Sequence, residues 1–335
     1  MKLNRRSFLK QTAAGGAVVL AAPSLVSAAG SADSIRVGYL HTLAVDGQIW
    51  MADMKGYWKD QGLNPTFTRF YTGLEIFQAM VGGSIDMLST GAVVSNFPAQ
   101  GQGKVFLAND VEFATAQLWV NPKMGVKSFE DLKGKKIATS IGTTAHVFLD
   151  KALRAHGLTP GKDVSLINQR MPDAVTAFIA GAVPAIALWV PFNVQVEKQM
   201  PDAKMLDDAS SYYPQAAILD GWAARNDFYD SQKDILSRVI KAWLPANRDL
   251  IEDTDASLKM LQEQKYPDIS LKDLHTQFKA SKLFSADDWA KKYKDGTVTK
   301  WLQNVTDFYA NIGGMSDPLK ASQYFDPSLF LAQVG

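Results

Sequence analysis

The feature that most constrains this fold is an alternation of short strands and helices, which occurs twice along the chain. The first occurrence predicts strands at 35–39, 65–71 and 85–88 and helices at 49–58 and 74–81. The second predicts strands at 136–139, 164–167 and 185–189 and helices at 145–156 and 173–180. Strands that alternate with helices at this spacing form parallel sheets with helices on both faces. The sequence therefore predicts an α/β fold in two lobes.

The turns and the C-terminal third complete this prediction. Polar or glycine-containing turns are expected at 41–48, 89–92, 140–144, 189–193 and 220–222. After residue 232 the helical period predicts helices at 234–250, 256–264, 271–278, 286–293 and 297–311. We expect this mainly helical third to return to the first lobe.

The first 29 residues predict an export signal. Arg5 and Arg6 precede an apolar run at 13–26, and small residues follow it. A basic start, an apolar middle and a small-residue end are typical of a cleaved signal, and the arginine pair resembles the twin-arginine type. The alternative is a membrane anchor, but the run is shorter than the roughly 20 residues that span a bilayer. We expect cleavage near Ala28 or Ala29 and a periplasmic location.

Composition excludes several classes of function. Without the four basic residues of the signal, the chain has 31 basic and 34 acidic side chains, so it lacks the basic surplus of a nucleic-acid-binding protein. Cysteine is absent, which removes thiol nucleophiles, iron–sulfur ligation and cysteine-type zinc sites. The remaining length is enough for two domains.

No catalytic motif is present. The four histidines are scattered without a metal-ligand spacing. The segment 157–163 departs from a phosphate loop in both its glycine spacing and its final residue, and there is no Gly-x-Ser-x-Gly elbow. We therefore expect a protein that is not an enzyme, with no catalytic residue, no metal site and no cofactor.

Four segments resemble a known family. They are 82–91, 129–138, 188–192 (Leu-Trp-Val-Pro-Phe) and 220–228 (Asp-Gly-Trp-Ala-Ala-Arg-Asn-Asp-Phe). Together they are similar to solute-binding proteins of ABC importers, in the taurine, aliphatic sulfonate and nitrate branch, and most of all to taurine-binding proteins. One departure is Pro184, where this branch usually has Asp before the strand.

The resemblance implies a periplasmic binding protein fold of type II, in which each lobe is a mostly parallel sheet flanked by helices. It implies lobe 1 at 34–118, lobe 2 at 119–222 and a return to lobe 1 at 223–335. The implied ligand is a small zwitterion or anion, taurine-like in the first instance. The implied partners are a membrane permease and an ATPase, and we expect a monomer.

Two turns are candidates for binding an anionic group. Ser89, Thr90 and Gly91 follow one strand, and Thr143 and Thr144 open a helix after another. Unpaired N–H groups at helix starts suit a sulfonate or a carboxylate. Ordinary N-capping needs the same residue types, so capping is the alternative for both. The family resemblance favours ligand contact.

Acidic and aromatic residues are candidates for binding a cationic group. Asp220 follows an apolar run at a strand edge, and in taurine-like relatives an acidic residue at the matching position takes the amine. Its alternative is a salt bridge within the protein. Asp46 is a second candidate, with a solvated turn as its alternative. Trp189 and Trp222 could contact an ammonium group by cation–π attraction or could be core aromatics.

Two other functions stay open. Enzymes of thiamin-pyrimidine synthesis share the fold, but their cysteine-rich segment is missing here. A sensory ligand receptor is the other possibility. The ligand also stays open between aminosulfonates, aliphatic sulfonates, amino-acid-like zwitterions and aromatic acids.

Overall fold

Two five-stranded sheets form the framework in the computed structural model, which describes residues 32–313 and 315–334. The predicted export signal at 1–29 lies outside the described residues. In the first sheet the strand order is β2-β1-β3-β10-β4. Its strands are β1 (Asp33–Leu40), β2 (Leu63–Phe70), β3 (Met87–Thr90), β4 (Lys104–Val111) and β10 (Leu219–Ala224). β1 is parallel to β2 and β3, whereas β10 runs antiparallel between β3 and β4.

The second sheet repeats this arrangement with the order β7-β6-β8-β5-β9. Its strands are β5 (Ala116–Val120), β6 (Lys136–Thr139), β7 (Ser165–Asn168), β8 (Ala185–Trp189) and β9 (Lys204–Asp208). β6 is parallel to β7 and β8, and β5 runs antiparallel between β8 and β9. The prediction of two mostly parallel sheets is confirmed, with one antiparallel strand in each.

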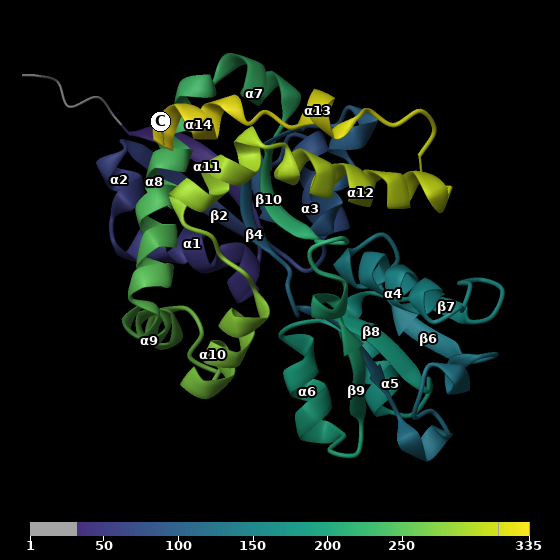
Figure 1. The fold of residues 1–335 in the computed structure, drawn as a ribbon. Helices are drawn as coiled ribbons and strands as arrows, with labels where there is room; N and C mark the ends of the chain where they lie inside the picture. The colour runs from purple at the N-terminus through teal and green to yellow at the C-terminus, as the bar shows by residue number, and fades with distance from the viewer. Residues whose placement is uncertain (1–31, 314, 335) are drawn as a thin grey trace, which may run out of the picture. The chain divides into compact units, whose positions relative to one another are not determined.

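Helices flank each sheet (Figure 1). Those of the first two thirds are α1 (Leu43–Met54), α2 (Tyr57–Asp60), α3 (Gly73–Val81), α4 (Thr144–Ala155), α5 (Met171–Ile179), α6 (Phe192–Gln199) and α7 (Asn226–Ser231). The others are α8 (Lys233–Glu252), α9 (Thr254–Gln264), α10 (Leu271–Ala280), α11 (Ala286–Lys294), α12 (Thr297–Asn311), α13 (Ala321–Tyr324) and α14 (Ser328–Val334). α1, α3 and α8 contact the first sheet, and α4, α5 and α6 contact the second. None of the described helices is both long enough and apolar enough to span a bilayer.

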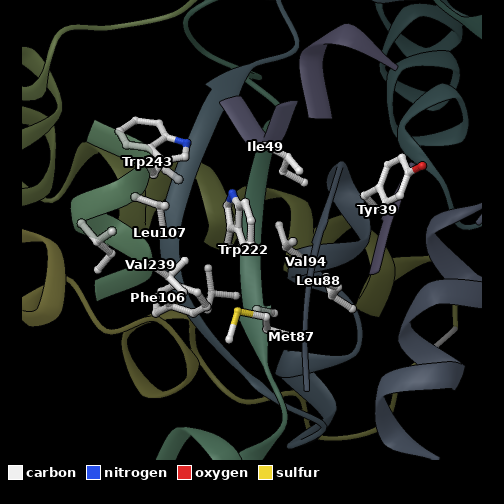
Figure 2. Packing of buried hydrophobic residues seen from close by; sticks show 14 of the residues in the cluster. Tyr39, Ile49, Met87, Leu88, Val94, Phe106, Leu107, Trp222, Val239 and Trp243 are labelled. Atoms are coloured by element: carbon white, nitrogen blue, oxygen red, sulfur yellow. The ribbon is translucent and has the colours of Figure 1, made fainter. Parts of the chain in front are cut away.

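The core of the first sheet is built around aromatic side chains. Trp222 on β10 is fully buried, and Figure 2 shows its indole ring among Ile49, Val94 and Leu107. Trp243 on α8 is also fully buried in this cluster. Complete burial of such large side chains contributes several kcal/mol to the free energy of folding, at about 1.5–3 kcal/mol for each.

The chain crosses between the sheets twice. Residues 112–115 lead from β4 to β5, and residues 209–218 lead from β9 back to β10. β5 thus begins before the expected boundary at 119, and β10 belongs to the first sheet although the expected second lobe runs to 222. The division into domains at 34–118, 119–222 and 223–335 stays a prediction.

The local predictions fail in three places. The turn expected at 41–48 is short, because α1 already begins at Leu43 and includes Gly47. This helix is buried along most of its length and contacts α8, so packing outweighs the weak helix propensity of glycine. The turn expected at 220–222 lies within β10, and the strands β4, β5 and β9 have no counterpart in the sequence-based prediction.

Candidate functional site

A pocket lies where the loops after β1, β3 and β8 meet the crossing segment 112–115 and the start of α4. Its polar and aromatic lining consists of Thr42, Thr90, Glu112, Thr115, Thr143, Thr144, Trp189 and Asp220, with Gly91 beside them. No Lys, Arg or His belongs to this lining among the described residues. The pocket therefore presents hydroxyls and carboxylates, and none of its described lining residues is a basic side chain that could balance the carboxylates.

Asp220 is the buried acid of this pocket. It sits on β10 directly opposite Asp110 of β4, and both side chains are at most 1% exposed. Within the described residues, none of the four carboxylate oxygens of this pair has a hydrogen-bond partner. A buried polar group without a partner is costly, so these atoms are candidates for contact with a ligand. Asp110 lies behind Asp220 and does not line the pocket.

Glu112 is a third carboxylate beside this pair. Thr115 Oγ1 donates to its Oε2 at 2.7 Å, and Thr144 Oγ1 donates to its Oε1 at 2.6 Å. Burial, and then the charge of Glu112, raise the pKa of both Asp110 and Asp220 well above the ordinary value of an aspartate. The charge of Asp110 also raises the pKa of Asp220, because a like charge this close disfavours the charged form.

Gly91 allows the polar groups to converge. A Cβ at this position would lie 2.6 Å from Thr144 Oγ1 and 3.0 Å from Asp220 Oδ1, and it would also collide with Glu112. The next residue, Ala92, donates its N–H to Thr144 Oγ1 at 3.1 Å. A chain of hydrogen bonds thus runs from the loop after β3 through Thr144 to Glu112. It joins the first sheet to the first turn of α4.

The other candidate hydroxyl groups differ in whether they line the pocket and are free to contact a ligand. Thr90 Oγ1 is buried, lines the pocket and has no partner within the described residues. Thr143 lines the pocket, but its Oγ1 donates to Ser140 O at 2.7 Å, and it makes no side-chain cap on α4. Ser89 Oγ donates to Val45 O at 3.0 Å and is outside the lining. Capping thus explains none of these three, and Ser89 holds β3 against α1.

Trp189 and Trp222 lie in different environments. Trp189, at the end of β8, lines the pocket and packs edge-on against Phe192 with ring centroids 5.6 Å apart. Trp222 is outside the pocket, in the core of the first sheet. Two residues of strand span about 7 Å, which is enough to carry the chain from Asp220 at the pocket into the core.

Asp46 is also outside the pocket, because its side chain is already satisfied within the protein. His41 Nδ1 lies 2.6 Å from its Oδ2, Trp50 Nε1 donates to the same oxygen at 2.7 Å, and the Tyr266 hydroxyl donates to Oδ1. Burial raises the pKa of Asp46, and the hydrogen bond from His41 opposes this shift. The early start of α1 places Asp46 in the first helical turn, where it faces these groups.

Sequence reasoning missed Glu112 and Asp110. Both belong to the end of β4 and the crossing segment after it. The apolar runs 105–108 and 118–120 are the signal that could have located β4 and β5. Only the pairing of β4 with β10 shows that Asp110 is opposite Asp220. Among the described residues, no group of three or more His, Cys, Asp or Glu side chains could hold a metal ion.

Comparisons with known proteins agree with this architecture. The family model described as "NMT1/THI5 like" matches residues 47–257. A putative binding protein of Brucella abortus is 28% identical over 333 residues, covering 99% of this chain and 100% of that protein. The taurine-binding periplasmic protein of Escherichia coli is 28% identical over 244 residues, covering 72% of this chain and 74% of that protein.

A solved structure shows the same fold. The alkanesulfonate-binding protein of Xanthomonas axonopodis pv. citri, bound to MOPS, matches with a TM-score of 0.70 and 19% identity. The match covers 88% of this chain and 98% of that one. The α/β fold with two mixed sheets is thus that of periplasmic binding proteins, and the chain belongs to the NMT1/THI5-like family.

Proposed function

We propose that this protein is the extracytoplasmic solute-binding component of an ABC importer and that its solute carries an amine, with taurine and related aminosulfonates as first candidates. The observation that carries the proposal is the buried carboxylate of Asp220, which lines the pocket without a protein partner within the described residues. An ammonium group of the solute would supply this partner. The similarity to taurine-binding and sulfonate-binding proteins supports the same class of solute.

The other end of the solute has candidate partners in the same pocket. Thr90 offers its hydroxyl to a sulfonate or a carboxylate. The start of α4 at Thr143 and Thr144 offers backbone N–H groups to the same anion. Trp189 would form an apolar wall beside the ammonium group. Asp46 and Trp222 have no part in this proposal, because both are occupied elsewhere in the protein.

The two crossing segments fit a protein that closes on its solute. Glu112 belongs to the first crossing, and Asp220 is the second residue of β10, the strand that follows the second crossing. A change of angle at these segments would move one sheet against the other around the pocket. In this proposal a membrane permease and a cytoplasmic ATPase complete the importer, and the protein works as a monomer in the periplasm without a cofactor.

The experiment compares three solutes that differ in one group each. Taurine has both an amine and a sulfonate, ethanolamine keeps only the amine, and ethanesulfonate keeps only the sulfonate. In thermal unfolding, a solute at 100 times its dissociation constant adds roughly 2.7 kcal/mol to the free energy of unfolding. We expect stabilisation by taurine, a smaller effect of ethanolamine and the weakest effect of ethanesulfonate.

Two results would contradict the proposal. Equal stabilisation by ethanesulfonate and taurine would remove the amine from recognition and leave a receptor for plain sulfonates. Conversion of a bound solute into a product, detected by mass spectrometry after incubation, would replace the receptor by an enzyme. Recovery of the intact solute after denaturation of the complex is the expected outcome.

A further inference from the structure

The pocket and the strand beside it hold three carboxylates, which is more than a single ammonium group balances. Asp110, Asp220 and Glu112 gather at the ends of β4 and β10, and none of them forms an ion pair within the described residues. Burying three uncompensated negative charges together is strongly unfavourable. The question is therefore whether a positive group on a neighbouring helix or strand compensates these charges.

The titratable and charged groups that pack near this cluster do not neutralise it. Lys282 pairs with Val111 through its backbone, but its ammonium group lies over the rings of Phe113 and Tyr213, at 5.5 Å and 5.6 Å. On α4, burial lowers the pKa of His146, whose Nδ1 accepts a hydrogen bond from Gly142 N. On α12, the Tyr309 hydroxyl donates to Gly142 O.

The geometry of the ladder makes Asp110 and Asp220 a pair. They are directly opposite each other on antiparallel strands, where Cβ atoms lie roughly 4.5–5.5 Å apart. Two carboxyl groups held this close and away from water do not both ionise, so one retains a proton. Glu112 differs from them, because its two carboxylate oxygens accept hydrogen bonds from the hydroxyls of Thr115 and Thr144.

We propose that Asp110 and Asp220 share one proton in the ligand-free protein and that the ammonium group of the solute displaces this proton when it binds at Asp220. This inference rests on the proposed function, because it assumes an aminated solute. The O–H bond of the shared acid breaks, the proton passes to solvent, and an ammonium N–H donates to the freed carboxylate. A cation enters as a proton leaves, so the charge inside the pocket does not change.

The exchange makes binding depend on pH. Below the pKa of the shared proton, affinity for the solute falls about tenfold for each pH unit, because one proton is released for each solute bound. Above that pKa, affinity no longer depends on this pair. The pair titrates as a unit, so the apparent pKa belongs to both carboxyl groups.

The first arm of the test uses the protein without solute. Carbon-13 NMR of the aspartate carboxyl groups, recorded at pH values upward from the ordinary aspartate pKa of about 3.9, follows the protonation of each acid. We expect the signals of Asp110 and Asp220 both to titrate in this range in the wild type, and in Asp110→Asn we expect the signal of Asp220 to titrate at lower pH. Asp227→Asn, at an exposed position, is the matched control and should keep both signals. Full ionisation of both acids throughout this range would overturn the inference.

The second arm measures proton release on binding. Calorimetric titration with taurine and with ethanolamine is run in phosphate and in Tris at one pH, chosen below the apparent pKa that the first arm finds for the shared proton. The difference in heat between the buffers gives the number of protons released. We expect up to one proton for each solute in the wild type and in Asp227→Asn, and a markedly smaller number in Asp110→Asn. Binding of either amine without proton release overturns this inference and leaves the proposed function intact. If neither amine binds and ethanesulfonate binds instead, both this inference and the proposed function are overturned.

Discussion

At Gly91 a single added carbon atom would meet Thr144, Asp220 and Glu112 at once. We expect Gly91→Ala to cost about 1–3 kcal/mol in free energy of unfolding, as overpacking of a filled interior does. Taurine binding should fall with it, because the added methyl group pushes the polar groups of the pocket apart. Denaturant unfolding and calorimetric titration measure the two effects.

Gly47→Ala is the control for this substitution. The new Cβ would lie 3.4 Å from Leu43 Cδ1 of α1 and 3.5 Å from Leu250 Cδ1 of α8, which are ordinary van der Waals contacts. Alanine favours a helix over glycine by roughly 0.5–1 kcal/mol, so this variant should unfold no more easily than the wild type. Equal losses of stability in the two variants would contradict the special role of Gly91.

The stability of the ligand-free protein should also depend on Asp110 and Asp220. Burial and the charge of Glu112 raise both pKa values in the folded state, so the folded protein binds more protons than the unfolded chain does. Their contribution to stability is full below the ordinary aspartate pKa of about 3.9 and is lost as the pH rises through the raised pKa values. Asp110→Asn should therefore gain stability relative to the wild type between acid and neutral pH. The measurement is thermal unfolding of both proteins, without solute, across this pH range. Melting temperatures that change with pH in parallel in the two proteins would contradict this prediction.

The sequence predicts Asp220 but not its two neighbours, for a physical reason. Asp220 follows an apolar run within a family-like segment, so local pattern alone suggests a strand edge. Asp110 and Glu112 become part of the site only through the pairing of β4 with β10, which joins segments more than 100 residues apart. Asp46 is the opposite case, a residue predicted for the site that lies outside it. Its hydrogen bond from Tyr266 is a long-range contact that no local pattern indicates.

At the scale of elements, β10 serves the pocket at its start and the core further along. Trp222→Ala should cost about 3–5 kcal/mol in free energy of unfolding, as truncation of a buried tryptophan does. The protein that remains folded should keep its affinity for taurine, because the indole ring does not line the pocket. A large loss of taurine affinity in the folded variant, measured by calorimetry, would instead assign Trp222 to the ligand site.

Helices with clear end signals were predicted best. α11 and α12 agree closely with the expected ranges, and Ser285 caps α11 by accepting a hydrogen bond from Asp288 N. α1 was predicted too late, because Gly47 was interpreted as part of a turn although the helix is buried around it. Packing against α8 decides this case, and such contacts are invisible in a local window.

For the whole molecule, the sequence predicted the two α/β sheets and the fold of periplasmic binding proteins, which the structure and the comparisons confirm. The alternation of strands and helices, which occurs twice, is a strong local signal, so it can be recognised without knowledge of long-range contacts. The strands β4 and β5, which lie on either side of the first crossing, were not predicted from the sequence. The export signal and the domain boundaries stay predictions.

The central claim is that Asp220 binds the amine of the solute. Calorimetric titration of taurine into the wild type, Asp220→Asn and the exposed control Asp227→Asn tests it most directly. Loss of one partner of a desolvated charge pair costs about 2–5 kcal/mol, so affinity in Asp220→Asn should fall at least about thirtyfold. Asp227→Asn should bind like the wild type. Unchanged taurine affinity in a folded Asp220→Asn variant would contradict the claim and assign Asp220 a structural role.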